Sequence, residues 1–579
     1  MICDSGVVMK NLLVADIFEG IADILEIKNE NPFKIRAYRR AALNIKGLAE
    51  DVEALAKEDK LSAIPGIGKE LEAKIKEIIA TNFLKYYEKL KKEIPRGILD
   101  LMLVPGIGPK TARVLHDSLK INSVQDLEKK ARSHEIRGLP GLKEKTEENI
   151  LRGIELVKKR AARMSLKEAL DLAGEIVPEL KKLSGVKKIS VAGSLRRMKE
   201  TVRDIDILLT SSRPRAVMGA FVKLPLVRDV LAHGDTKSSI LTENGIQVDV
   251  RVVEERSFGA ALLYFTGSQA HNIHIRHIAK KMGMKVNEYG VFPEKTNRSV
   301  AGRTEEEVYK AMKLSFIPPE LREDRGEIEA AAKGKLPKLL ELSDIKGDLH
   351  VHSKWSDGMH SVEEIARAAK RKGYEYIAIT DHSKTLKVAR GLSEKDVMKK
   401  MAEIERVNKK IKGIKVLCGT EVDILQDGSL DYDKRMLKRF DIVVAAIHSG
   451  FKEPKEKLTT RVIKAMESGL IHILAHPTGR LMGSRDPYEL DFAKIFKTAM
   501  QTRTCMEISA FHERLDLDDV NSRAAKEAGV KLAIGTDAHI IDQLDSMLLG
   551  LSVARRAWLE KKDVLNTSDL DSLLKLIRK

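Results

Sequence analysis

Three short segments near the middle of the chain carry residue types that suit phosphoryl transfer with metal ions. Residues 193–197 read Gly-Ser-Leu-Arg-Arg, Asp204 and Asp206 follow in an Asp-Ile-Asp run, and Asp249 stands alone further on. A turn of small residues can grip a phosphate, and three carboxylates can hold two divalent cations that clamp the attacking and leaving oxygens of an in-line displacement. Together with the Tyr-Phe-Thr-Gly-Ser string at 264–268, these segments predict one nucleotidyl-transfer site.

The sequence around the carboxylates has the alternation of β-strands, which would place these groups together. Residues 189–194 form a short apolar run that ends in small residues, as a strand leading to an exposed corner does. Because successive side chains of a strand point to opposite faces, Asp204 and Asp206 share one face, and Asp249 lies opposite Val248 in its own strand. Converging carboxylates repel one another unless cations lie between them, and oxygen ligands favour Mg²⁺. The alternative for the Asp-Ile-Asp run alone is a solvated strand face, which the turn upstream disfavours.

The chain resembles the family X DNA polymerases, the group that contains eukaryotic DNA polymerase beta, because these motifs occur in that family's order and at its spacing. The resemblance implies that Asp204, Asp206 and Asp249 bind two ions, Mg²⁺ or Mn²⁺, and that Asp249 is also the base toward the primer 3′-hydroxyl. Arg203 departs from the pattern, because relatives have glycine there, and a bulky cation would alter triphosphate binding. The implied substrate contacts are Ser194, Arg197 and Arg163 to the triphosphate, Tyr264 and Phe265 beside Gly267 to the sugar, Asn272 to the base and Arg276 to the template.

The composition favours a polyanionic partner. The chain has 579 residues, and 103 Lys and Arg against 85 Asp and Glu give a net charge of +18 and a pI near 9.4. That length suffices for about three or four domains. Aromatic residues make up only 4 % of the chain, so contacts to a nucleic-acid backbone should outweigh base stacking.

The cysteines and the N-terminus indicate a cytoplasmic protein. Cys3, Cys418 and Cys505 form no Cys-x-x-Cys pair, so neither a disulfide frame nor a cysteine zinc site is expected, and a reducing compartment fits. Asp4 and Lys10 interrupt any apolar run at the N-terminus, so no signal peptide is expected. No stretch is long and apolar enough to span a membrane.

A short motif recurs in the first 150 residues. Residues 64–69 and 104–110 each contain Pro-Gly-Ile-Gly before a helical pattern, and residues 139–142 read as a degenerate third copy. The glycines permit a tight turn, and the N–H groups at the start of the next helix can face a phosphate without reading sequence. An ordinary helix connector is the alternative for a single copy. The repeats resemble helix-hairpin-helix motifs, whose implied DNA contacts are Gly66, Gly68, Lys69, Gly106, Gly108 and Lys110.

Lys74 lies in the helix expected after the first hairpin, where the resemblance raises a second activity. Some family X enzymes excise the 5′-deoxyribose phosphate through a lysine Schiff base, and Lys74 falls at the offset of that lysine from the hairpin glycines. The nucleophile must be a neutral amine. However, Lys69 and Lys76 crowd the same helix, and Glu70 stands where relatives often have a phosphate-binding lysine. A catalytic lysine and a solvated lysine on a DNA-facing helix both remain open.

The second half of the chain carries a different set of metal-ligand residues. His350 and His352 alternate onto one face of an expected strand, and further strand-like runs end near histidines or carboxylates with helical segments between them. Alternation of strand and helix implies a parallel sheet, and the carboxyl ends of such strands converge on one mouth. Mixed histidine and carboxylate ligands suit Zn²⁺ or Mn²⁺. A single His-x-His could be a pair of buried structural histidines, but that alternative does not explain ligand-type residues at the ends of so many strands.

This series resembles the polymerase and histidinol phosphatase (PHP) domain, whose sites hydrolyse phosphate esters through metal-bound hydroxide. The resemblance implies a distorted seven-stranded barrel that binds about three ions, Zn²⁺ or Mn²⁺. The implied ligands are His350, His352, Asp357, His382, Glu421, His448, His476, Asp537 and His539. We expect Asp348, Asp381, Asp423 and Glu507 to support the ligands or to cap strand ends, with a metal bridge by one of them as the alternative. Arg390, Arg480 and Arg485 are candidate phosphate contacts or surface arginines.

We therefore predict a multidomain protein with α-helical helix-hairpin-helix N-terminal domains, an α+β nucleotidyltransferase palm and a C-terminal distorted (β/α)7 PHP barrel. Two prolines and mixed charges near residues 316–344 indicate a linker. The expected parts are 1–92 (lyase-like helical domain), 93–160 (second helical DNA-binding domain), 161–255 (palm), 256–320 (nucleotide-selection subdomain, like a thumb or fingers), 321–342 (linker) and 343–579 (PHP phosphoesterase domain).

The predicted function is gap-filling DNA polymerization in DNA repair, combined with PHP 3′–5′ exonuclease, abasic-site endonuclease or 3′-phosphatase activity. The expected partners are gapped or nicked DNA and deoxynucleoside triphosphates, bound by a monomer. One alternative is a PHP phosphoesterase whose front half only binds DNA, with Arg203 marking lost nucleotide use. The other is a small-molecule phosphatase, which the hairpins and the charge of +18 disfavour.

Overall fold

The computed structural model describes residues 7–46, 52–81, 83–95, 97–102, 104, 106–139, 141–161, 163–296 and 298–578. The chain forms two compact units, Met1–Ala161 and Ala162–Lys579, and each has a hydrophobic core of its own. Cys3 and the hairpin residues Pro105 and Pro140 lie outside the described residues.

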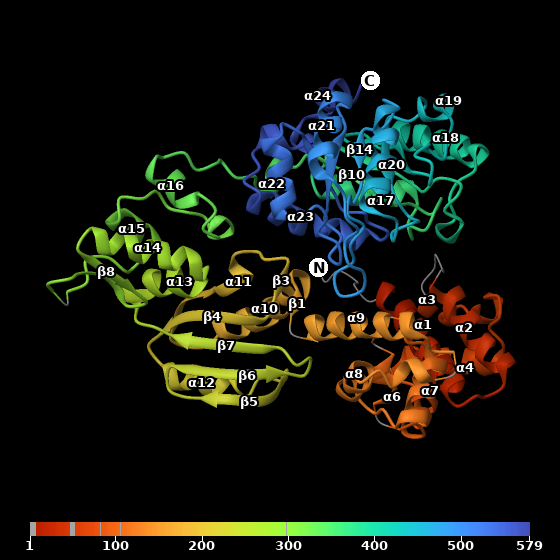
Figure 1. The fold of residues 1–579 in the computed structure, drawn as a ribbon, viewed down its shortest axis with the longest axis horizontal. Coiled ribbons are helices and arrows are strands. Elements are labelled where there is room, and N and C mark those ends of the chain that lie inside the picture. The colour runs from red at the N-terminus through yellow and green to blue at the C-terminus, as the bar shows by residue number, and fades with distance from the viewer. Residues whose placement is uncertain are drawn as a thin grey trace. The chain divides into compact units, whose positions relative to one another are not determined.

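The first unit is built from helices (Figure 1). Val14, Phe18, Ile21 and Leu25 recur every three to four residues along the first helix and are buried. This helix packs against α2, α4, α5 and α7, so it is the centre of the unit. The helices are α1 (Val7–Ile27), α2 (Pro32–Lys46), α3 (Val52–Lys57), α4 (Lys69–Thr81), α5 (Lys85–Lys92), α6 (Ile98–Leu101), α7 (Pro109–Leu119), α8 (Val124–Arg132) and α9 (Glu144–Ala161).

The three hairpin motifs have the same backbone turn. Gly66, Gly106 and Gly141 have φ angles of 84°, 92° and 80°, a left-handed conformation that glycine adopts without strain. Helices α4, α7 and α9 begin within a few residues of these glycines, so the degenerate third copy keeps the geometry of the other two. In each turn an N–H donates to the carbonyl three residues earlier at 3.0 Å: Ile67 to Ile64, Ile107 to Val104 and Leu142 to Leu139.

The second unit begins with a five-stranded mixed sheet of order β2-β4-β7-β6-β5. Strands β4 and β7 run parallel, whereas the other neighbours are antiparallel. Ile205, Val248 and Val250 are buried in one core with Ile176 of α10 and Phe221 of α12, so these helices cover the apolar face predicted for the sheet. The elements are β1 (Met164–Ser165), α10 (Leu166–Lys181), β2 (Val186–Val191), α11 (Gly193–Arg196), β3 (Thr201–Val202), β4 (Asp204–Ser211), α12 (Pro214–Phe221), β5 (Val227–His233), β6 (Lys237–Thr242) and β7 (Gln247–Val252).

A smaller subdomain with its own apolar cluster follows the sheet. Arg322 has an exposed fraction of 0 %, and its Nη1 donates to Glu305 at 2.6 Å. His271 bonds Glu327 at 2.7 Å and the Tyr309 hydroxyl at 2.9 Å. Arg322 and Glu327 belong to the stretch 321–342 expected to be a linker, so its first part is packed into this subdomain. The elements are α13 (Phe258–Thr266), α14 (Gln269–Lys281), β8 (Met284–Asn287), β9 (Gly290–Pro293), α15 (Glu305–Ala311) and α16 (Glu327–Ala332).

The rest of the second unit is a barrel of seven parallel strands in sequential order, β10 to β16. Its ends meet where the Asp537 N–H donates to the His350 carbonyl and the His352 N–H donates to the Ala538 carbonyl, both at 2.9 Å. The strands are β10 (Gly347–Val351), β11 (Tyr376–Ile379), β12 (Lys415–Asp423), β13 (Ile442–Ala446), β14 (Ile473–Leu474), β15 (Cys505–Ser509) and β16 (Leu532–Gly535). The helices are α17 (Val362–Arg371), α18 (Glu394–Lys410), α19 (Lys434–Leu437), α20 (Lys455–Glu467), α21 (Phe492–Thr502), α22 (Asp519–Glu527), α23 (Met547–Arg556) and α24 (Leu570–Ile577).

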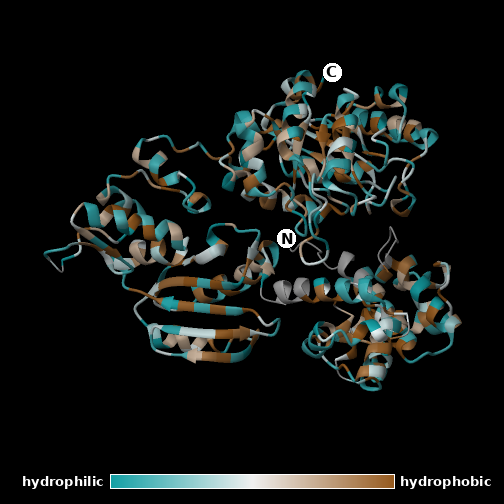
Figure 2. Ribbon diagram, in the orientation of Figure 1, coloured by the Kyte–Doolittle hydropathy of each residue, from teal (hydrophilic) through white to brown (hydrophobic). Residues whose placement is uncertain are grey.

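Hydrophobic residues gather on the strands of the barrel, whereas its outer helices alternate between hydrophobic and hydrophilic faces (Figure 2). The barrel strands β10 and β13 are buried at every residue, as expected for parallel strands covered on both faces. Cys418 and Cys505 are both buried. Among the described helices, none is long and apolar enough to cross a membrane.

Candidate active sites

The three predicted catalytic aspartates lie on one face of the mixed sheet. In the parallel pairing of β4 with β7, Asp206 stands beside Asp249 and Asp204 stands beside Gln247. Burial, reinforced by the charges of Asp204 and Asp249, raises the pKa of Asp206 to about 6. In the described part of the chain these three are not among the groups whose ligand atoms all lie within 4.8 Å of one another. The sheet therefore brings the aspartates together as predicted, and their charges repel.

The turn before β4 lies directly against these carboxylates. Gly193 has a φ angle of 60°, and a Cβ added there would lie 2.5 Å from Asp206 Oδ2. The Ala192 N–H donates to the Asp206 carbonyl at 2.8 Å, and Ser194 follows in the short helix α11. Only glycine fits at position 193 without displacing the carboxylate.

The predicted triphosphate arginines have protein partners in this structure. Arg197 Nε donates to Glu323 at 3.0 Å, and Arg197 Nη1 donates to the Thr266 carbonyl. Arg163 donates to the side chain and the carbonyl of Thr201 at 2.8 and 2.6 Å. Arg203, which departs from the family pattern, pairs with Asp204 at 3.6 Å. Arg197 is thus held by Glu323 and by the end of α13, and Arg163, which directly precedes β1, is bonded to β3.

The predicted sugar and base contacts lie on α13 and α14. The rings of Tyr264 and Phe265 meet edge to face with centroids 5.2 Å apart. Gly267 ends α13 with a φ angle of 71°, and Asn272 Nδ2 donates to the Tyr264 carbonyl at 2.7 Å. Arg276 Nε bonds the Asn272 carbonyl at 3.3 Å. These five predicted contacts therefore lie along one connected edge of the subdomain.

Arg251, which lies on β7 two residues after Asp249, was given no functional role from the sequence. Its guanidinium lies 4.6 Å from the centre of the Phe265 ring, and its Nε is buried with no hydrogen-bond partner. Alternation along β7 places it on the face of Asp249, which was the available signal. It also lines a cavity of about 930 Å³ whose other basic residues are Lys237, Arg256, Arg298 and Arg303.

The hairpin residues predicted to contact DNA are exposed, whereas the apolar residues of the same turns are buried. Ile64, Ile67, Val104 and Ile107 belong to the core of the first unit. Lys69 and Lys110 lie in the first turns of α4 and α7. The exposed residues are Gly66, Gly68, Lys69, Gly106, Gly108 and Lys110.

Lys74 lies on α4 in an ion pair with Glu70, and its ammonium sits over the rings of Tyr86 at 4.8 Å and Tyr38 at 5.6 Å. Burial disfavours the charged ammonium, but hydrogen bonds to Glu70 and Tyr38 outweigh it and raise the pKa of Lys74. The side chain is therefore held as a cation, which is the wrong state for a Schiff-base nucleophile.

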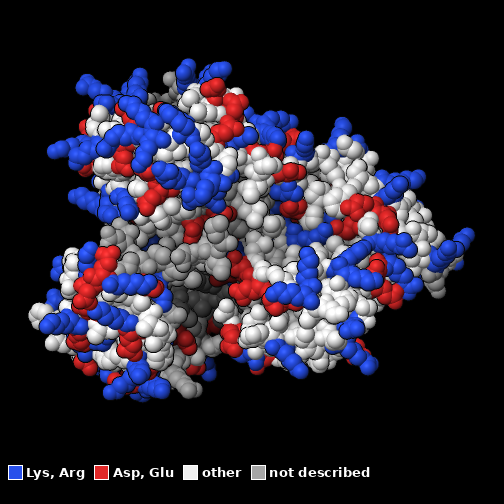
Figure 3. Space-filling view, turned by 180° about the vertical axis from the view of Figure 1, so that it is seen from behind, with Lys and Arg blue, Asp and Glu red and all other residues white. Residues whose placement is uncertain are grey.

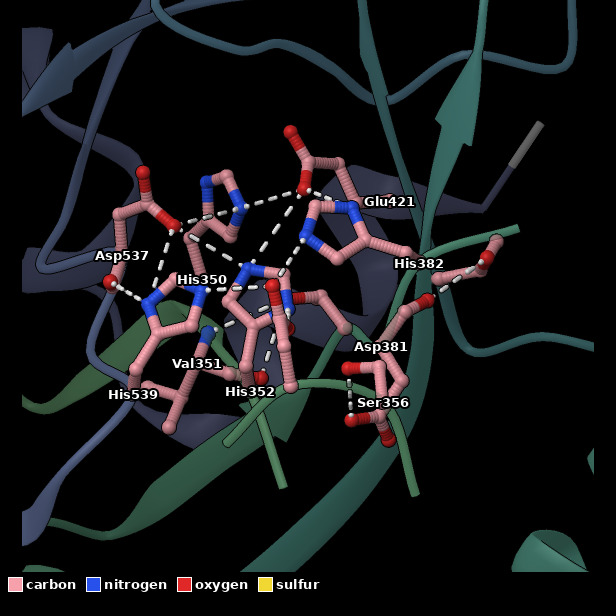
Figure 4. A network of polar contacts seen from close by, with 12 residues as sticks. His350, Val351, His352, Ser356, Asp381, His382, Glu421, Asp537 and His539 are labelled. Carbon is pink, nitrogen blue, oxygen red and sulfur yellow. Dashed lines mark hydrogen bonds and ion pairs between the residues drawn. The ribbon is translucent and has the colours of Figure 1, made fainter. Parts of the chain in front are cut away.

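The predicted ligands of the second site converge at the carboxyl ends of the barrel strands. In Figure 4 the imidazoles of His350, His352 and His382 point toward the carboxylates of Glu421 and Asp537. Three overlapping groups have ligand atoms within 4.8 Å of one another: His352, Asp357, His382 and His539; His350, His352 and Asp537; and His382, Glu421 and His448. His476 is not in these groups, although its Nε2 lies 2.9 Å from Glu421 Oε1.

Glu421 is the centre of this cluster. Its carboxylate oxygens lie 2.8 Å from His382 Nδ1, 3.3 Å from His448 Nε2 and 3.5 Å from both His350 Nε2 and His352 Nε2. Burial opposes ionisation, but the surrounding imidazoles hold the pKa of Glu421 well below its usual range. Glu421 is therefore a carboxylate available to a cation.

Metal ions fit this cluster because its ligand atoms are buried and lack hydrogen-bond partners. Buried polar atoms without a partner are costly in proteins. Divalent cations that accept histidine nitrogen and carboxylate oxygen are suited to such atoms. These atoms are His350 Nε2, both ring nitrogens of His352, Asp357 Oδ1, His382 Nδ1, Glu421 Oε2, His448 Nδ1 and His476 Nδ1.

Of the four carboxylates expected to support the ligands, Glu507 and Asp423 lie against predicted ligand side chains, whereas Asp348 and Asp381 have other partners. His350 Nδ1 bonds Glu507 at 2.7 Å, which turns Nε2 toward the cluster. Asp348 accepts from the Thr536 hydroxyl at 2.5 Å, and Asp381 pairs with the buried Lys400 at 2.9 Å. Asp423 lies 3.5 Å from His448 Nδ1.

The three barrel arginines that were candidate phosphate contacts have different surroundings. Arg480 donates hydrogen bonds to Glu200 at 2.6 Å and to the carbonyls of Arg514 and Leu515. Arg390 is exposed. Arg485 stacks on a phenylalanine ring. Arg514, which sequence reasoning missed, lies 3.6 Å from Asp537, and its Nε and Nη1 are buried without a partner. Its guanidinium beside the cluster suits a phosphate oxygen.

Four segments of the chain match known protein families. Residues 9–84 match the helix-hairpin-helix domain and residues 98–155 the SAM-like helix-hairpin-helix tandem. Residues 261–323 match the DNA polymerase beta thumb, and residues 348–511 match the PHP domain. The three aspartates of the sheet, together with Asp537 and His539, lie outside these four segments.

The chain is also similar to characterised and named proteins. The DNA polymerase/3′-5′ exonuclease PolX of Bacillus subtilis is 40 % identical over 564 residues, which cover 96 % of this chain and 98 % of the relative. A probable phosphatase of Thermoanaerobacter sp. is 32 % identical over 231 residues, 38 % of this chain and 89 % of the relative. A probable phosphatase of Syntrophotalea carbinolica is 26 % identical over 235 residues, 38 % of this chain and 90 % of the relative.

The fold joins helix-hairpin-helix repeats, a mixed sheet and a histidine-rich parallel barrel on one chain. The chain belongs to the family X DNA polymerases with a beta-type thumb and a C-terminal PHP domain, the family of PolX. The predicted family and fold class are therefore confirmed.

Proposed function

We propose that this chain is a DNA-directed DNA polymerase that fills gaps during DNA repair, and that its PHP barrel removes nucleotides from DNA 3′ ends. The observation that carries the proposal is the 40 % identity to the Bacillus subtilis DNA polymerase/3′-5′ exonuclease PolX, which runs through both halves of the chain. The pairing of Asp206 with Asp249 supports the first activity, and the unpartnered ligand atoms of the barrel support the second.

In the polymerase site, Asp204, Asp206 and Asp249 would hold two ions, Mg²⁺ or Mn²⁺. Such ions, when bound, neutralise charge on the triphosphate and favour ionisation of the primer 3′-hydroxyl. We assign Asp249 as the base that accepts the hydroxyl proton, because it stands directly beside Asp206 in the sheet. Ser194 and Arg197 are assigned to the triphosphate, since Gly193 lets the turn lie against the same carboxylate.

The α13–α14 edge would select the nucleotide. Tyr264 and Phe265, packed ring against ring beside Gly267, would crowd the sugar, and Asn272 would reach the base in the minor groove. We assign Arg276, one helical turn after Asn272 on α14, to the template strand. The assignment of Arg163 to the triphosphate rests only on the family spacing, because its guanidinium donates to Thr201 in this structure.

DNA binding would rest mainly on contacts to the phosphate backbone. Lys and Arg side chains cover much of the face shown in Figure 3, especially over the barrel. The cavity of about 930 Å³ beside Arg251 is lined by five basic and three acidic residues among uncharged ones, and its excess of positive charge suits a nucleic-acid strand. The hairpins present Gly66, Gly68 and Lys69, and then Gly106, Gly108 and Lys110, at helix N-termini, where backbone N–H groups bind phosphate.

In the PHP site, the nine predicted ligands would hold about three ions, Zn²⁺ or Mn²⁺. Ions bound there would supply hydroxide at neutral pH and polarise the phosphate. Arg514 would bind a phosphate oxygen and so orient the terminal nucleotide. Glu507 would keep His350 in the tautomer that directs Nε2 to the centre.

Two variants test the two-site proposal. We expect Asp204→Ala to abolish nucleotide incorporation on a gapped, 5′-labelled primer while 3′–5′ degradation continues. His350→Ala combined with His352→Ala should do the reverse. Loss of both activities in each variant would contradict independent sites, and absence of extension by the unmodified protein would leave only a DNA-binding phosphoesterase.

A second activity of the barrel, removal of a 3′-phosphate, is favoured by the probable phosphatases that match this part of the chain. We expect turnover of a 3′-phosphorylated oligonucleotide to exceed that of a small phosphomonoester, because the hairpins and basic surface recruit DNA. Faster turnover of the small ester would point instead to a small-molecule phosphatase. Monomeric state and cytoplasmic location stay predictions from the sequence.

A further inference from the structure

The turn that carries Arg197 is also bound by the PHP barrel. Arg556, at the end of α23, donates from Nη1 to the Arg197 carbonyl at 2.8 Å and lies 3.1 Å from Glu323 Oε1. The same oxygen of Glu323 accepts from Arg197 Nε at 3.0 Å. The exposed fractions of the three side chains are 13 % for Arg197, 13 % for Glu323 and 4 % for Arg556, so water screens these charges only weakly.

One carboxylate oxygen is therefore shared by two guanidinium groups from different parts of the unit. Burial opposes ionisation of Glu323, but Arg197 and Arg556 lower its pKa, so it carries a full negative charge at neutral pH. Arg556 is itself held by Asp519, whose carboxylate accepts from Nη2 at 2.6 Å. Asp519 therefore fixes the position of Arg556. The strength of the ion pair between Glu323 and Arg197 thus depends on Arg556, a barrel residue far away in the sequence.

A second contact ties the same palm segment to the barrel. Glu200, three residues after Arg197, pairs with Arg480 at 2.6 Å. Arg480 also donates to the carbonyls of Arg514 and Leu515, which belong to the loop that places Arg514 beside Asp537. The segment after α11 is thus attached to the barrel at both Arg197 and Glu200.

The assignment of Arg197 to the triphosphate, on which this inference rests, sets up a competition. An incoming triphosphate must draw the Arg197 guanidinium away from Glu323. We propose that Arg556 is a positioning residue of the polymerase site: by sharing Glu323, it weakens the hold of Glu323 on Arg197 and frees Arg197 for the nucleotide. The PHP barrel thereby tunes the nucleotide affinity of the palm, a coupling between two sites in one chain.

The competition predicts opposite effects of two substitutions. In Arg556→Gln, Arg197 becomes the only guanidinium on Glu323, with Lys199 Nζ at 4.0 Å as the remaining nearby cation, so the Kd for the matched nucleotide should rise about fivefold, at the low end of coupling between sites. In Glu323→Gln, Arg197 loses its charged partner and keeps the Thr266 carbonyl, so the same Kd should fall by about the same factor. The double variant should resemble Glu323→Gln, because Arg556 acts on the Arg197 guanidinium through Glu323, whereas its direct hydrogen bond reaches only the Arg197 backbone carbonyl. The measurement is nucleotide binding to full-length protein on one-nucleotide-gapped DNA with a dideoxy-terminated primer, in Ca²⁺ to prevent turnover.

Arg555 provides the matched control. It lies next to Arg556 on α23 and also binds the thumb side, through Glu320 at 2.8 Å and the Leu340 carbonyl at 2.5 Å, but it has no described contact with Arg197. Arg555→Gln should therefore leave the Kd unchanged, and Arg556→Lys, which keeps the charge, should restore it close to the original value. If Arg556→Gln does not fold, the proposal is tested by the other two variants: it requires a lower Kd in Glu323→Gln and a Kd close to the original in Arg556→Lys.

Four outcomes overturn the proposal. If Arg556→Gln and Glu323→Gln shift the Kd in the same direction, the two residues serve only to hold the structure together. If Arg555→Gln weakens binding as much as Arg556→Gln does, the effect belongs to the interface as a whole. If the unmodified protein extends no primer, the polymerase assignment is wrong and this inference is wrong with it. If the unmodified protein extends the primer but Arg556→Gln and Glu323→Gln leave the Kd unchanged, only this inference is wrong.

Discussion

Asp206 and Asp249 stand side by side on parallel strands β4 and β7, although 42 residues separate them in the chain. The pairing puts two carboxylates on the face opposite the packed core, and Gly193 closes the site from the adjacent turn. Burial, reinforced by the charges of Asp204 and Asp249, raises the pKa of Asp206 to about 6, which has a measurable consequence for stability.

Asp206→Asn should stabilise the metal-free protein at neutral pH. An aspartate whose folded-state pKa lies above its unfolded value destabilises the fold increasingly as pH rises from the unfolded to the folded value. The variant's advantage should therefore be absent near pH 4, grow up to about pH 6 and then stay at roughly 1–3 kcal/mol. Chemical denaturation in EDTA at several pH values measures it. A variant less stable than the original at pH 7.5 would show that repulsion does not govern Asp206.

Gly193→Ala should impair nucleotide incorporation more than it impairs folding. The left-handed backbone costs about 1 kcal/mol for alanine, and the new Cβ would press on Asp206 Oδ2 from 2.5 Å. We expect incorporation to fall by about tenfold or more, as misplacement of catalytic groups does, with exonuclease activity unchanged. Gly219→Ala in α12 is the control, because nothing lies within 4 Å of its added Cβ. Full incorporation by Gly193→Ala would place the chemistry elsewhere.

Arg514→Gln should reduce exonuclease turnover without affecting extension. Its unpartnered Nε and Nη1 lie beside the ligand cluster, and loss of a buried charged contact to phosphate costs about a hundredfold in rate. Arg390→Gln, an exposed site in the same barrel, should behave like the unmodified protein. Single-turnover degradation of a 5′-labelled strand gives both rates, and equal rates for the two variants would remove Arg514 from the site.

Lyase activity at Lys74 should be weak, because Glu70 helps to raise the pKa of the amine. Glu70→Gln removes this partner and lowers the pKa of Lys74, so more neutral amine is present at pH 7.5. We expect borohydride trapping on 5′-deoxyribose-phosphate DNA to increase by about twofold to fivefold, the range of an exposed ion pair. Lys74→Ala should abolish trapping. Trapping that persists in Lys74→Ala would assign the chemistry to another lysine.

The local parts of both sites could be predicted from the sequence. Alternation placed Asp204 and Asp206 on one face, and strand ends marked His350, His352 and Glu421 as ligands, because these relationships depend on near neighbours in the chain. The hairpin turns were likewise visible, since glycine at a left-handed position is a local requirement.

Contacts between distant segments could not be predicted in this way. Register between β4 and β7 depends on sheet packing, and Arg514 reaches Asp537 only because two barrel loops meet. The stretch near residues 316–344 looked like a linker because of its prolines and mixed charges. Yet Arg322 and Glu327 are buried, where Arg322 pairs with Glu305 and Glu327 pairs with His271. Buried charge pairs have no signature in a single sequence, since each member alone has the character of a surface residue.

The fate of a 5′-labelled primer on one-nucleotide-gapped DNA tests the central claim most directly. With the unmodified protein and Mn²⁺, we predict growth by one nucleotide when the matched triphosphate is present and stepwise shortening when it is absent, and EDTA should stop both. A primer that shortens at the same rate with and without triphosphate, and never grows, would contradict the account.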